Sequence, residues 1–421
     1  MSDIAKAPPA PERMHALDAV RGFALLLGIV FHATLSFLPS KVPLWAIMDS
    51  QRSATLGVVF FATHVFRMTT FFLIAGFFAH MSFHKKGAKG FVADRLKRIA
   101  LPLIVAWPFL FAGILAATIW GVIVMNGGHL PKGPSPTWPR FPAFPLTHLW
   151  FLYVLLEFYA ATLILRGALA ALDRQGRVRA GIDRLVALLT QSALAPIVLA
   201  MPLSLVLATA PHWRAWFGIP TPDDSFVTNP AALTGFSLAF GFGWALHRQP
   251  DLLRALERRW ALNLALAIAA ISVCLRVIGV TPQVYPITDP ARHLAAAIAY
   301  PIASWTSTFA LIGAALRFLP GYSPTRRYIA DASYWLYLIH MPIVMALQVV
   351  VSRLDWPWPV KFVGLLAVAF ALMFASYQLL VRYSFIGAIL NGRRAPRDKA
   401  KRLPTRPTSS TPGEGLKEAL P

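Results

Sequence analysis

An apolar run at 17–38 opens with the sequence Leu17-Asp-Ala-Val-Arg-Gly-Phe-Ala-Leu-Leu-Leu-Gly-Ile-Val-Phe-His32. A helix needs about 20 apolar residues to cross the hydrocarbon core of a bilayer, and this run meets that length. Nine further runs of this kind follow it, at 55–79, 99–125, 148–170, 185–209, 231–247, 261–280, 293–316, 329–351 and 362–384. The sequence therefore predicts an all-α fold, a polytopic membrane helix bundle of about ten transmembrane helices.

The composition agrees with a membrane protein. Of the 421 residues, 57% are hydrophobic and only 14% are charged. A soluble domain usually has about 45–50% apolar and about 25% charged residues. The single cysteine, Cys274, excludes an internal disulfide framework and a cysteine-based metal cluster.

The net charge of +22 is distributed in short basic clusters between the apolar runs. With ten spans, 28 of the 40 Lys and Arg residues fall on the side that holds both termini, and 8 fall on the other side. Because cytoplasmic loops carry the excess of Lys and Arg, both termini are expected in the cytoplasm. No contiguous basic groove remains, so nucleic acid is not an expected partner.

The expected domain organisation is simple. Residues 15–391 form the membrane domain, and residues 1–14 and 392–421 form disordered cytoplasmic tails, since both are rich in Pro, Lys and Ser or Thr. The tail at 392–421 is also basic. No internal repeat is visible in the sequence.

The first span carries two costly polar residues, Arg21 and His32. They are eleven residues apart, so they share one helical face with an axial separation of about 16 Å. Asp18 lies one turn before Arg21 and can pair with it. The alternative is that the two residues have no shared function. Arg21 would then extend towards the headgroups, and His32 would form a hydrogen bond with a neighbouring helix inside the bundle.

The second span holds His64 and Arg67, two potential cations one turn apart. Glu157 in the fourth span is the one acid in the middle of a predicted span, so an Arg67–Glu157 ion pair is expected. A structural ion pair and a catalytic one are both open at this point.

Two further patterns are candidates for substrate contacts. Ser333, Tyr337 and His340 share one face of the ninth span, which fits either a polar wall for a substrate or a hydrogen-bond ladder between helices. Arg95 and Arg98 lie one turn apart before the third span. Two guanidinium groups on one face can bind phosphate, although the basic excess of cytoplasmic loops also explains them.

Motifs of other enzyme classes are absent from the sequence. There is no phosphate-binding loop of the ATPase type, no H-E-x-x-H zinc motif and no G-x-S-x-G serine-nucleophile motif. No metal site is expected.

Several segments, taken together, resemble the acyltransferase 3 family of integral membrane acyltransferases. Arg21 and His32 match its R-x10-H motif, and Arg95 and Arg98 match its R-x-x-R motif. Similar segments also occur at Phe71-Phe-Leu-Ile-Ala-Gly-Phe77, His148-Leu-Trp-Phe-Leu-Tyr153 and Ser333-Tyr-Trp-Leu-Tyr-Leu-Ile-His340. Within the family, the sequence is most similar to the glucan biosynthesis protein C group, whose members succinylate glucans.

This resemblance implies an O-acyltransferase in the bacterial inner (plasma) membrane. An acyl group, acetyl or succinyl, would pass from cytoplasmic acyl-CoA, a co-substrate with no bound cofactor, to a hydroxyl of a periplasmic or cell-envelope glycan or a lipid-linked sugar. The catalytic candidates are His32, as general base, with Arg21 and Glu157; Arg95 and Arg98 would hold the donor phosphates. Arg67, Tyr337 and His340 would contact the substrate. Membrane lipids are the remaining expected partner.

Two other functions remain open on the residues alone. In a secondary transporter or flippase of a glycan or lipid intermediate, the same His, Arg and Glu residues would relay protons or bind the substrate. In a scaffold of an envelope complex, they would only hold helices together.

Overall fold

Helices make up most of the computed structural model, which describes residues 10–40, 42–131 and 137–392. In this part of the chain the helices are α1 Ala10–Thr34, α2 Ala54–Arg95, α3 Leu101–Met125, α4 Trp150–Leu172, α5 Arg177–Gln191, α6 Ala195–Ala208, α7 Pro230–Leu246, α8 Leu253–Arg258, α9 Trp260–Ile278, α10 Pro290–Phe318, α11 Pro324–Ser352, α12 Trp358–Ser376 and α13 Phe385–Asn391. Short turns of helix lie at Leu35–Phe37, Leu96–Ala100, Thr147–Leu149, Ala215–Phe217, Pro250–Leu252 and Tyr377–Val381. No strand occurs among the described residues, apart from one isolated bridge between Ala143 and Ser225.

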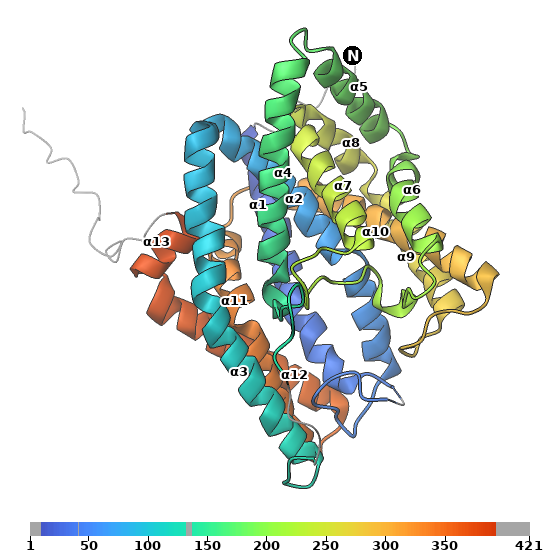
Figure 1. Cartoon of the computed structure of the whole chain (residues 1–421), viewed down its shortest axis with the longest axis vertical. Coiled ribbons are helices and arrows are strands. Elements are labelled where there is room, and N and C mark those ends of the chain that lie inside the picture. Colours follow the sequence, from blue (N-terminus) through green and yellow to red (C-terminus); the bar gives the residue numbers. More distant parts are fainter. Residues whose placement is uncertain (1–9, 41, 132–136, 393–421) are drawn as a thin grey trace, which may run out of the picture.

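Seven helical stretches in the described residues are long and apolar enough to cross a membrane, or eight if the bent pair α5 and α6 is one span. One of the seven, Ala54–Met125, is 72 residues long and contains two of the predicted spans. The chain leaves helical geometry at Gly87, where φ is 68°, and Figure 1 shows α2 and α3 running back from this turn. The structure confirms the prediction of an all-α membrane helix bundle.

One predicted span is wrong in detail. The apolar run at 185–209 is divided between the end of α5 and the whole of α6, and the chain bends by 111° between them. Run 231–247 corresponds to α7, a shorter apolar helix of 17 residues. The other eight runs each correspond to one long helix.

The predicted tails lie largely outside the described residues, which exclude 1–9 and 393–421. At the N-terminal end, however, the backbone is already helical from Ala10, inside the predicted tail.

Close helix packing in the centre of the bundle depends on two glycines. A Cβ atom added to Gly76 of α2 would overlap the backbone of Phe240, and one added to Gly243 of α7 would overlap the carbonyl of Leu73. Small residues at such crossings let two backbones approach, which is the usual basis of helix association in a membrane. These glycines hold α7 against the half of α2 that carries His64 and Arg67.

Candidate functional site

A large cavity, of about 1420 Å³, passes through the helix bundle. At one end it is lined by Lys85, Lys86, Arg95 and Arg98 around the α2–α3 turn, and at the other end by Trp45, His212, Arg214, Asp223 and Asp224 of the connecting loops. Between these ends it passes Arg21, His32, His64, Arg67, His148, Tyr337 and His340. All predicted site residues except Glu157 therefore line one continuous space.

Four histidines from four segments meet in the middle of this cavity. His32 lies on α1, His64 on α2, His148 in the turn before α4, and His340 on α11. The ring of His340 lies 5.1 Å from that of His32 and 5.0 Å from that of His148, centroid to centroid. The structure thus brings together imidazoles that are far apart in the sequence.

Backbone carbonyls fix the hydrogen positions on three of the four rings. A carbonyl only accepts, so Nδ1 of His340 donates to the Tyr337 oxygen at 2.6 Å and Nε2 of His148 donates to the Leu338 oxygen at 2.9 Å. In the same way, Nε2 of His64 donates to the Phe217 oxygen at 2.7 Å. The opposite nitrogen of each neutral ring is then an acceptor.

His32 differs from these three histidines. Its ring makes no hydrogen bond to a backbone carbonyl in the part of the chain that the structure describes, and its Nδ1 atom, like that of His64, is buried and has no hydrogen-bond partner there. Its ring packs edge-on against Phe31 at 4.9 Å. A histidine that lines a cavity and whose ring has no hydrogen bond to the protein is free to exchange a proton with a bound hydroxyl group.

Arg67 is buried beside the histidines. Its guanidinium lies over the Phe31 ring, 4.1 Å from the centroid, and Nη1 has no hydrogen-bond partner among the described residues. A Cβ atom at Gly28 would contact Nη1 at 3.6 Å, so the glycine leaves room for the guanidinium. A buried cation with an open N–H can stabilise negative charge that develops in the cavity.

The expected ion pair between Arg67 and Glu157 is wrong. Glu157 accepts a hydrogen bond from Thr228 Oγ1 at 2.6 Å, and it does not line the cavity. The reason is that the rotation and depth of each helix are set by packing, which the sequence pattern does not reveal. Glu157 connects α4 to the loop before α7.

The basic end of the cavity is built around Asp94. Arg95, Arg98 and Lys86 all approach its carboxylate, with Arg95 Nη2 at 3.5 Å and Arg98 Nη1 at 3.8 Å. The Nε atoms of both arginines are nevertheless buried without a partner among the described residues. The pair thus keeps donors free for an anion.

Arg21 and Arg327 share another acid at this end of the cavity. Arg21 Nη2 lies 3.1 Å from Asp18 Oδ1, which confirms the predicted pairing, and Arg327 Nη1 lies 3.3 Å from Asp18 Oδ2. Arg21 and His32 both line the cavity, as expected for residues on one helical face.

The opposite end of the cavity is covered by two loops that are joined to each other. Backbone N–H groups of Phe144 and Thr147 donate to the carbonyls of Asp224 and Asp223, at 2.8 and 3.0 Å. The rings of Phe144 and Phe226 stack at 4.5 Å. Burial raises the pKa of the Asp223 carboxyl above its ordinary value.

Several residues of the site were not singled out from composition or spacing. His148 follows Thr147, whose φ of 52° is rare for a non-glycine residue, and such strain at a cavity wall often accompanies function. Gln348 of α11 is fully buried and connects Trp45 to the backbone of His32. Tyr337, which the helical spacing did single out, donates its hydroxyl to the His148 carbonyl at 2.7 Å, so it supports the histidine cluster as well as lining the cavity.

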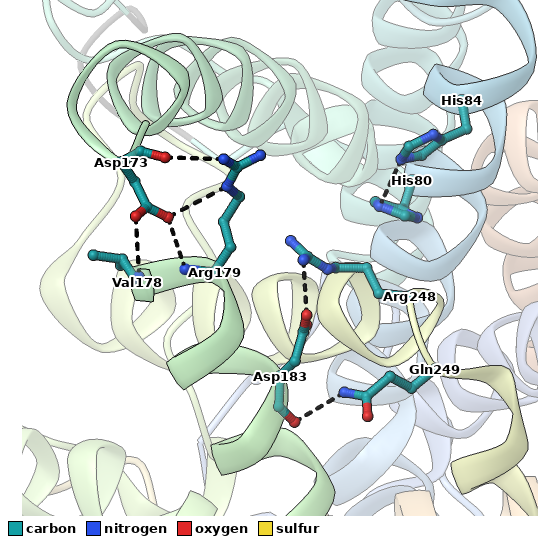
Figure 2. A network of polar contacts seen from close by, with 8 residues as sticks. All are labelled: His80, His84, Asp173, Val178, Arg179, Asp183, Arg248 and Gln249. Carbon is teal, nitrogen blue, oxygen red and sulfur yellow. Dashed lines mark hydrogen bonds and ion pairs between the residues drawn. The ribbon is translucent and has the colours of Figure 1, made fainter. Parts of the chain in front are cut away.

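A second group of histidines lies outside the cavity. His80 Nδ1 lies 2.8 Å from His247 Nδ1, and His84 Nε2 lies 3.1 Å from His80 Nε2, a contact visible in Figure 2. His80 uses opposite ring nitrogens for these contacts, so the three rings do not converge on one point. Among the described residues, no group of three or more His, Cys, Asp or Glu residues could hold a metal ion.

Comparison with known proteins gives a match to one family model and matches to several named proteins. Residues 14–378 match the family model described as acyltransferase domain, acyltransferase 3. Glucans biosynthesis protein C of Escherichia coli O6:K15:H31 (strain 536 / UPEC) is 30% identical over 157 residues, 35% of this chain and 37% of the relative. The protein of the same name from Escherichia coli K12 is 29% identical over an equal length.

The match thus spans little more than a third of these relatives, and no solved structure matches the chain. The domain match, in contrast, covers most of the sequence and all of the cavity residues up to Met345. The protein belongs to the acyltransferase 3 family and is a multi-pass membrane protein.

Proposed function

We propose that the protein transfers an acyl group, acetyl or succinyl, from acyl-CoA to a hydroxyl of a periplasmic or cell-envelope glycan. The main support is the cavity, which connects a basic end at Arg95 and Arg98 with a covered end at Asp223, and which passes His32 between them. Such a passage gives two substrates access from opposite ends of the bundle. The bacterial inner membrane is the location that this reaction requires, because acyl-CoA is cytoplasmic.

The donor binds at the basic end in this proposal. The free Nε donors of Arg95 and Arg98 suit the phosphates of CoA, since charge-assisted hydrogen bonds to phosphate are strong. Lys85 and Lys86 add positive charge at the same mouth. The thioester arm then extends along the cavity towards His32.

The acceptor enters from the opposite end. The loops at this end present Asp223, Asp224, His212 and Trp45 to the cavity, a mixture of polar and aromatic groups that suits a sugar. The name of the relatives, glucans biosynthesis protein C, supports a glucan as the first acceptor to test.

His32 acts as general base in the transfer step. Its imidazole takes the proton of the acceptor hydroxyl, whose oxygen attacks the thioester carbonyl carbon. The negative charge that forms on the carbonyl oxygen is stabilised by Arg67. The carbon–sulfur bond then breaks, and the proton passes from the imidazolium to the CoA thiolate, so that the products are the ester and CoA thiol.

The test compares His32→Ala with His129→Ala, a matched control at a histidine that does not line the cavity. Inverted membrane vesicles receive acetyl-CoA or succinyl-CoA labelled in the acyl group, with a short glucan inside. Transfer should fall by at least about 100-fold in His32→Ala, the usual contribution of a general base, and stay unchanged in the control. Full transfer by correctly inserted His32→Ala would contradict the proposal.

A further inference from the structure

Helix α5 differs from the other helices of the bundle in how its side chains are distributed. It is 15 residues long and carries Arg177, Arg179, Asp183 and Arg184 among apolar residues. Val178, Ile182, Leu185 and Leu188 are between 37% and 69% exposed. At 100° per residue these four lie within a sector of about 120°, which is the width of an amphipathic stripe.

The side of α5 that faces the protein is a different one. Val186 and Thr190 are buried, and they lie roughly opposite Arg177 and Arg184 on the helix. Arg177 and Arg184, seven residues apart, lie about 20° from each other and are both exposed. The helix therefore has three faces: one packed, one apolar and exposed, and one cationic and exposed.

Polar contacts hold α5 in this orientation (Figure 2). The Asp173 carboxylate accepts from the backbone N–H groups of Val178 and Arg179, at 3.2 and 3.0 Å, and caps the first turn. In the middle of the helix, Arg248 Nη2 donates to Asp183 Oδ2 at 2.8 Å and Gln249 Nε2 donates to the Asp183 carbonyl at 2.9 Å. The exposed apolar face is thus a fixed surface and not the result of a loosely placed helix.

The last turn of α5 is fixed as well. Arg259 donates to the carbonyls of Thr190 and Gln191, the former at 3.1 Å. The two acids near the helix, Asp173 and Asp183, are occupied by Arg179 and Arg248. Among the described residues, Arg177 and Arg184 have no acidic partner, so their charge is directed away from the protein.

The bend after α5 indicates how the helix lies relative to the membrane. The chain turns by 111° between α5 and the apolar helix α6, so the two axes are close to perpendicular. Helix α6 is apolar along its 14 residues and therefore suits the bilayer interior, so a bend of this size brings α5 towards the membrane surface. An amphipathic helix in that position buries its apolar face about 5–10 Å into the boundary between headgroups and acyl chains.

We propose that α5 is a membrane-surface helix that binds anionic phospholipid headgroups. The exposed stripe Val178, Ile182, Leu185 and Leu188 enters the lipid, and Arg177 and Arg184 contact the phosphates beside it. Charge complementarity supports an anionic headgroup, because two guanidinium groups without an acidic partner among the described residues lie along one edge of the stripe. This site is separate from the cavity, and its existence does not depend on the acyl acceptor.

The test measures which lipids contact α5 in the full-length protein. Leu185→Cys is labelled with a fluorophore; the native Cys274 is buried, so the label goes to the introduced thiol. The protein is placed in phosphatidylcholine vesicles with 30% phosphatidylglycerol, in which one lipid at a time carries bromine as quencher. Ile268→Cys, exposed at the middle of α9, is the control for a label deep in the bilayer.

Quenching at residue 185 should be strongest with bromine near the headgroup, whereas quenching at residue 268 should be strongest with bromine deep in the chains. Brominated phosphatidylglycerol should quench the label at 185 at least about threefold better than brominated phosphatidylcholine, since each basic residue near an anionic surface contributes about 1 kcal/mol. This preference should decrease in high salt.

Arg177→Gln with Arg184→Gln should abolish the preference for phosphatidylglycerol. Arg140→Gln with Arg353→Gln, which removes the same charge from exposed positions in other loops, should preserve it. An unchanged preference in the first variant would overturn the proposal. Loss of all quenching at residue 185, together with disulfide formation between two copies of the unlabelled Leu185→Cys variant, would also overturn it and would assign the face to a dimer contact.

Discussion

Gln348 donates its side-chain amide to the backbone carbonyl of His32 at 2.9 Å. Helix α1 changes to a tighter turn at Leu35, so the carbonyls near its end need partners from outside the helix. The other end of the same amide accepts from the Trp45 indole at 2.9 Å. One buried side chain thus connects the proposed base, the end of its helix and the loop between α1 and α2, which lines the cavity through Trp45.

Replacing Gln348 should therefore affect the chemical step. Gln348→Met loses both hydrogen bonds, and we expect kcat to fall by roughly tenfold, the effect of about one buried hydrogen bond, with little change in the KM for acyl-CoA. Trp45→Phe removes only the indole contact and should have a smaller effect. Steady-state kinetics in vesicles separate these cases, and an equal loss of folded protein in both variants would indicate a purely structural role.

The variant Gln348→Glu adds a pH-dependent readout. A carboxylate cannot donate to the His32 carbonyl, whereas a protonated carboxyl can. The activity of Gln348→Glu relative to the unmodified protein should therefore rise as the pH is lowered. A ratio that is constant with pH would contradict the positioning role of Gln348.

Arg95 and Arg98 should control donor binding. We expect Arg95→Gln with Arg98→Gln to raise the KM for acyl-CoA by at least about tenfold while kcat changes little, because hydrogen bonds between charged groups contribute about 1.5–3 kcal/mol each. Lys89→Gln with Lys97→Gln is the matched control, since it removes the same charge from the same turn at residues that do not line the cavity. Equal KM values for acyl-CoA in the two variants would show that the arginines do not bind the donor and contribute only to membrane topology.

Lys361 and Asp49 form an ion pair that is fully buried. Lys361 Nζ lies 2.9 Å from Oδ1 and 3.0 Å from Oδ2 of Asp49, and both side chains are 0% exposed. Lys361→Met leaves a buried carboxylate unpaired, so it should lower the free energy of unfolding by about 3–5 kcal/mol. Adding Asp49→Asn to Lys361→Met should restore much of the lost stability. Thermal unfolding in detergent measures both variants. If the double variant is no more stable than Lys361→Met, the lysine acts through packing instead.

Asp173 should give stability that depends on pH. The backbone N–H of Arg179 holds the pKa of this carboxyl below its ordinary value, as do the N–H of Val178 and the Arg179 side chain. A carboxyl whose pKa is lower in the folded than in the unfolded state stabilises the protein at pH values above the unfolded-state pKa. This stabilisation is lost as the pH falls through the folded-state pKa. Asp173→Asn should lower the thermal midpoint at neutral pH, and this difference should shrink below about pH 4. A difference that is constant with pH would exclude this explanation.

The helices could be predicted because a helix that crosses a membrane needs a long apolar run, and the sequence contains such runs. The prediction of one span at 185–209 failed because residues 185–191 are the end of α5, a helix that over its whole length is apolar on part of its surface only. A plot of apolar residues along the chain cannot distinguish such a stripe, followed by the apolar helix α6, from one continuous span. The arginines on the other faces of α5 were the signal of the difference.

The site was predictable where its residues lie on one helix. Arg21 and His32 share a face, and so do Tyr337 and His340, because helical spacing alone places them there. The contacts between helices were not predictable in this way. Glu157 was matched with Arg67 as the one acid in the middle of a span, yet it contacts Thr228, and the connection from Gln348 to Trp45 has no local pattern in the sequence.

The cavity has one more consequence, which concerns leakage. A passage lined by polar groups at both ends of a membrane protein could conduct protons and metal cations and so dissipate the gradient across the membrane. The guanidinium of Arg67, buried and without a countercharge at hydrogen-bond distance among the described residues, creates a positive electrostatic barrier inside this passage. Arg67, which is suited to stabilise a reacting anion, would then also prevent cations from crossing the bilayer through the cavity.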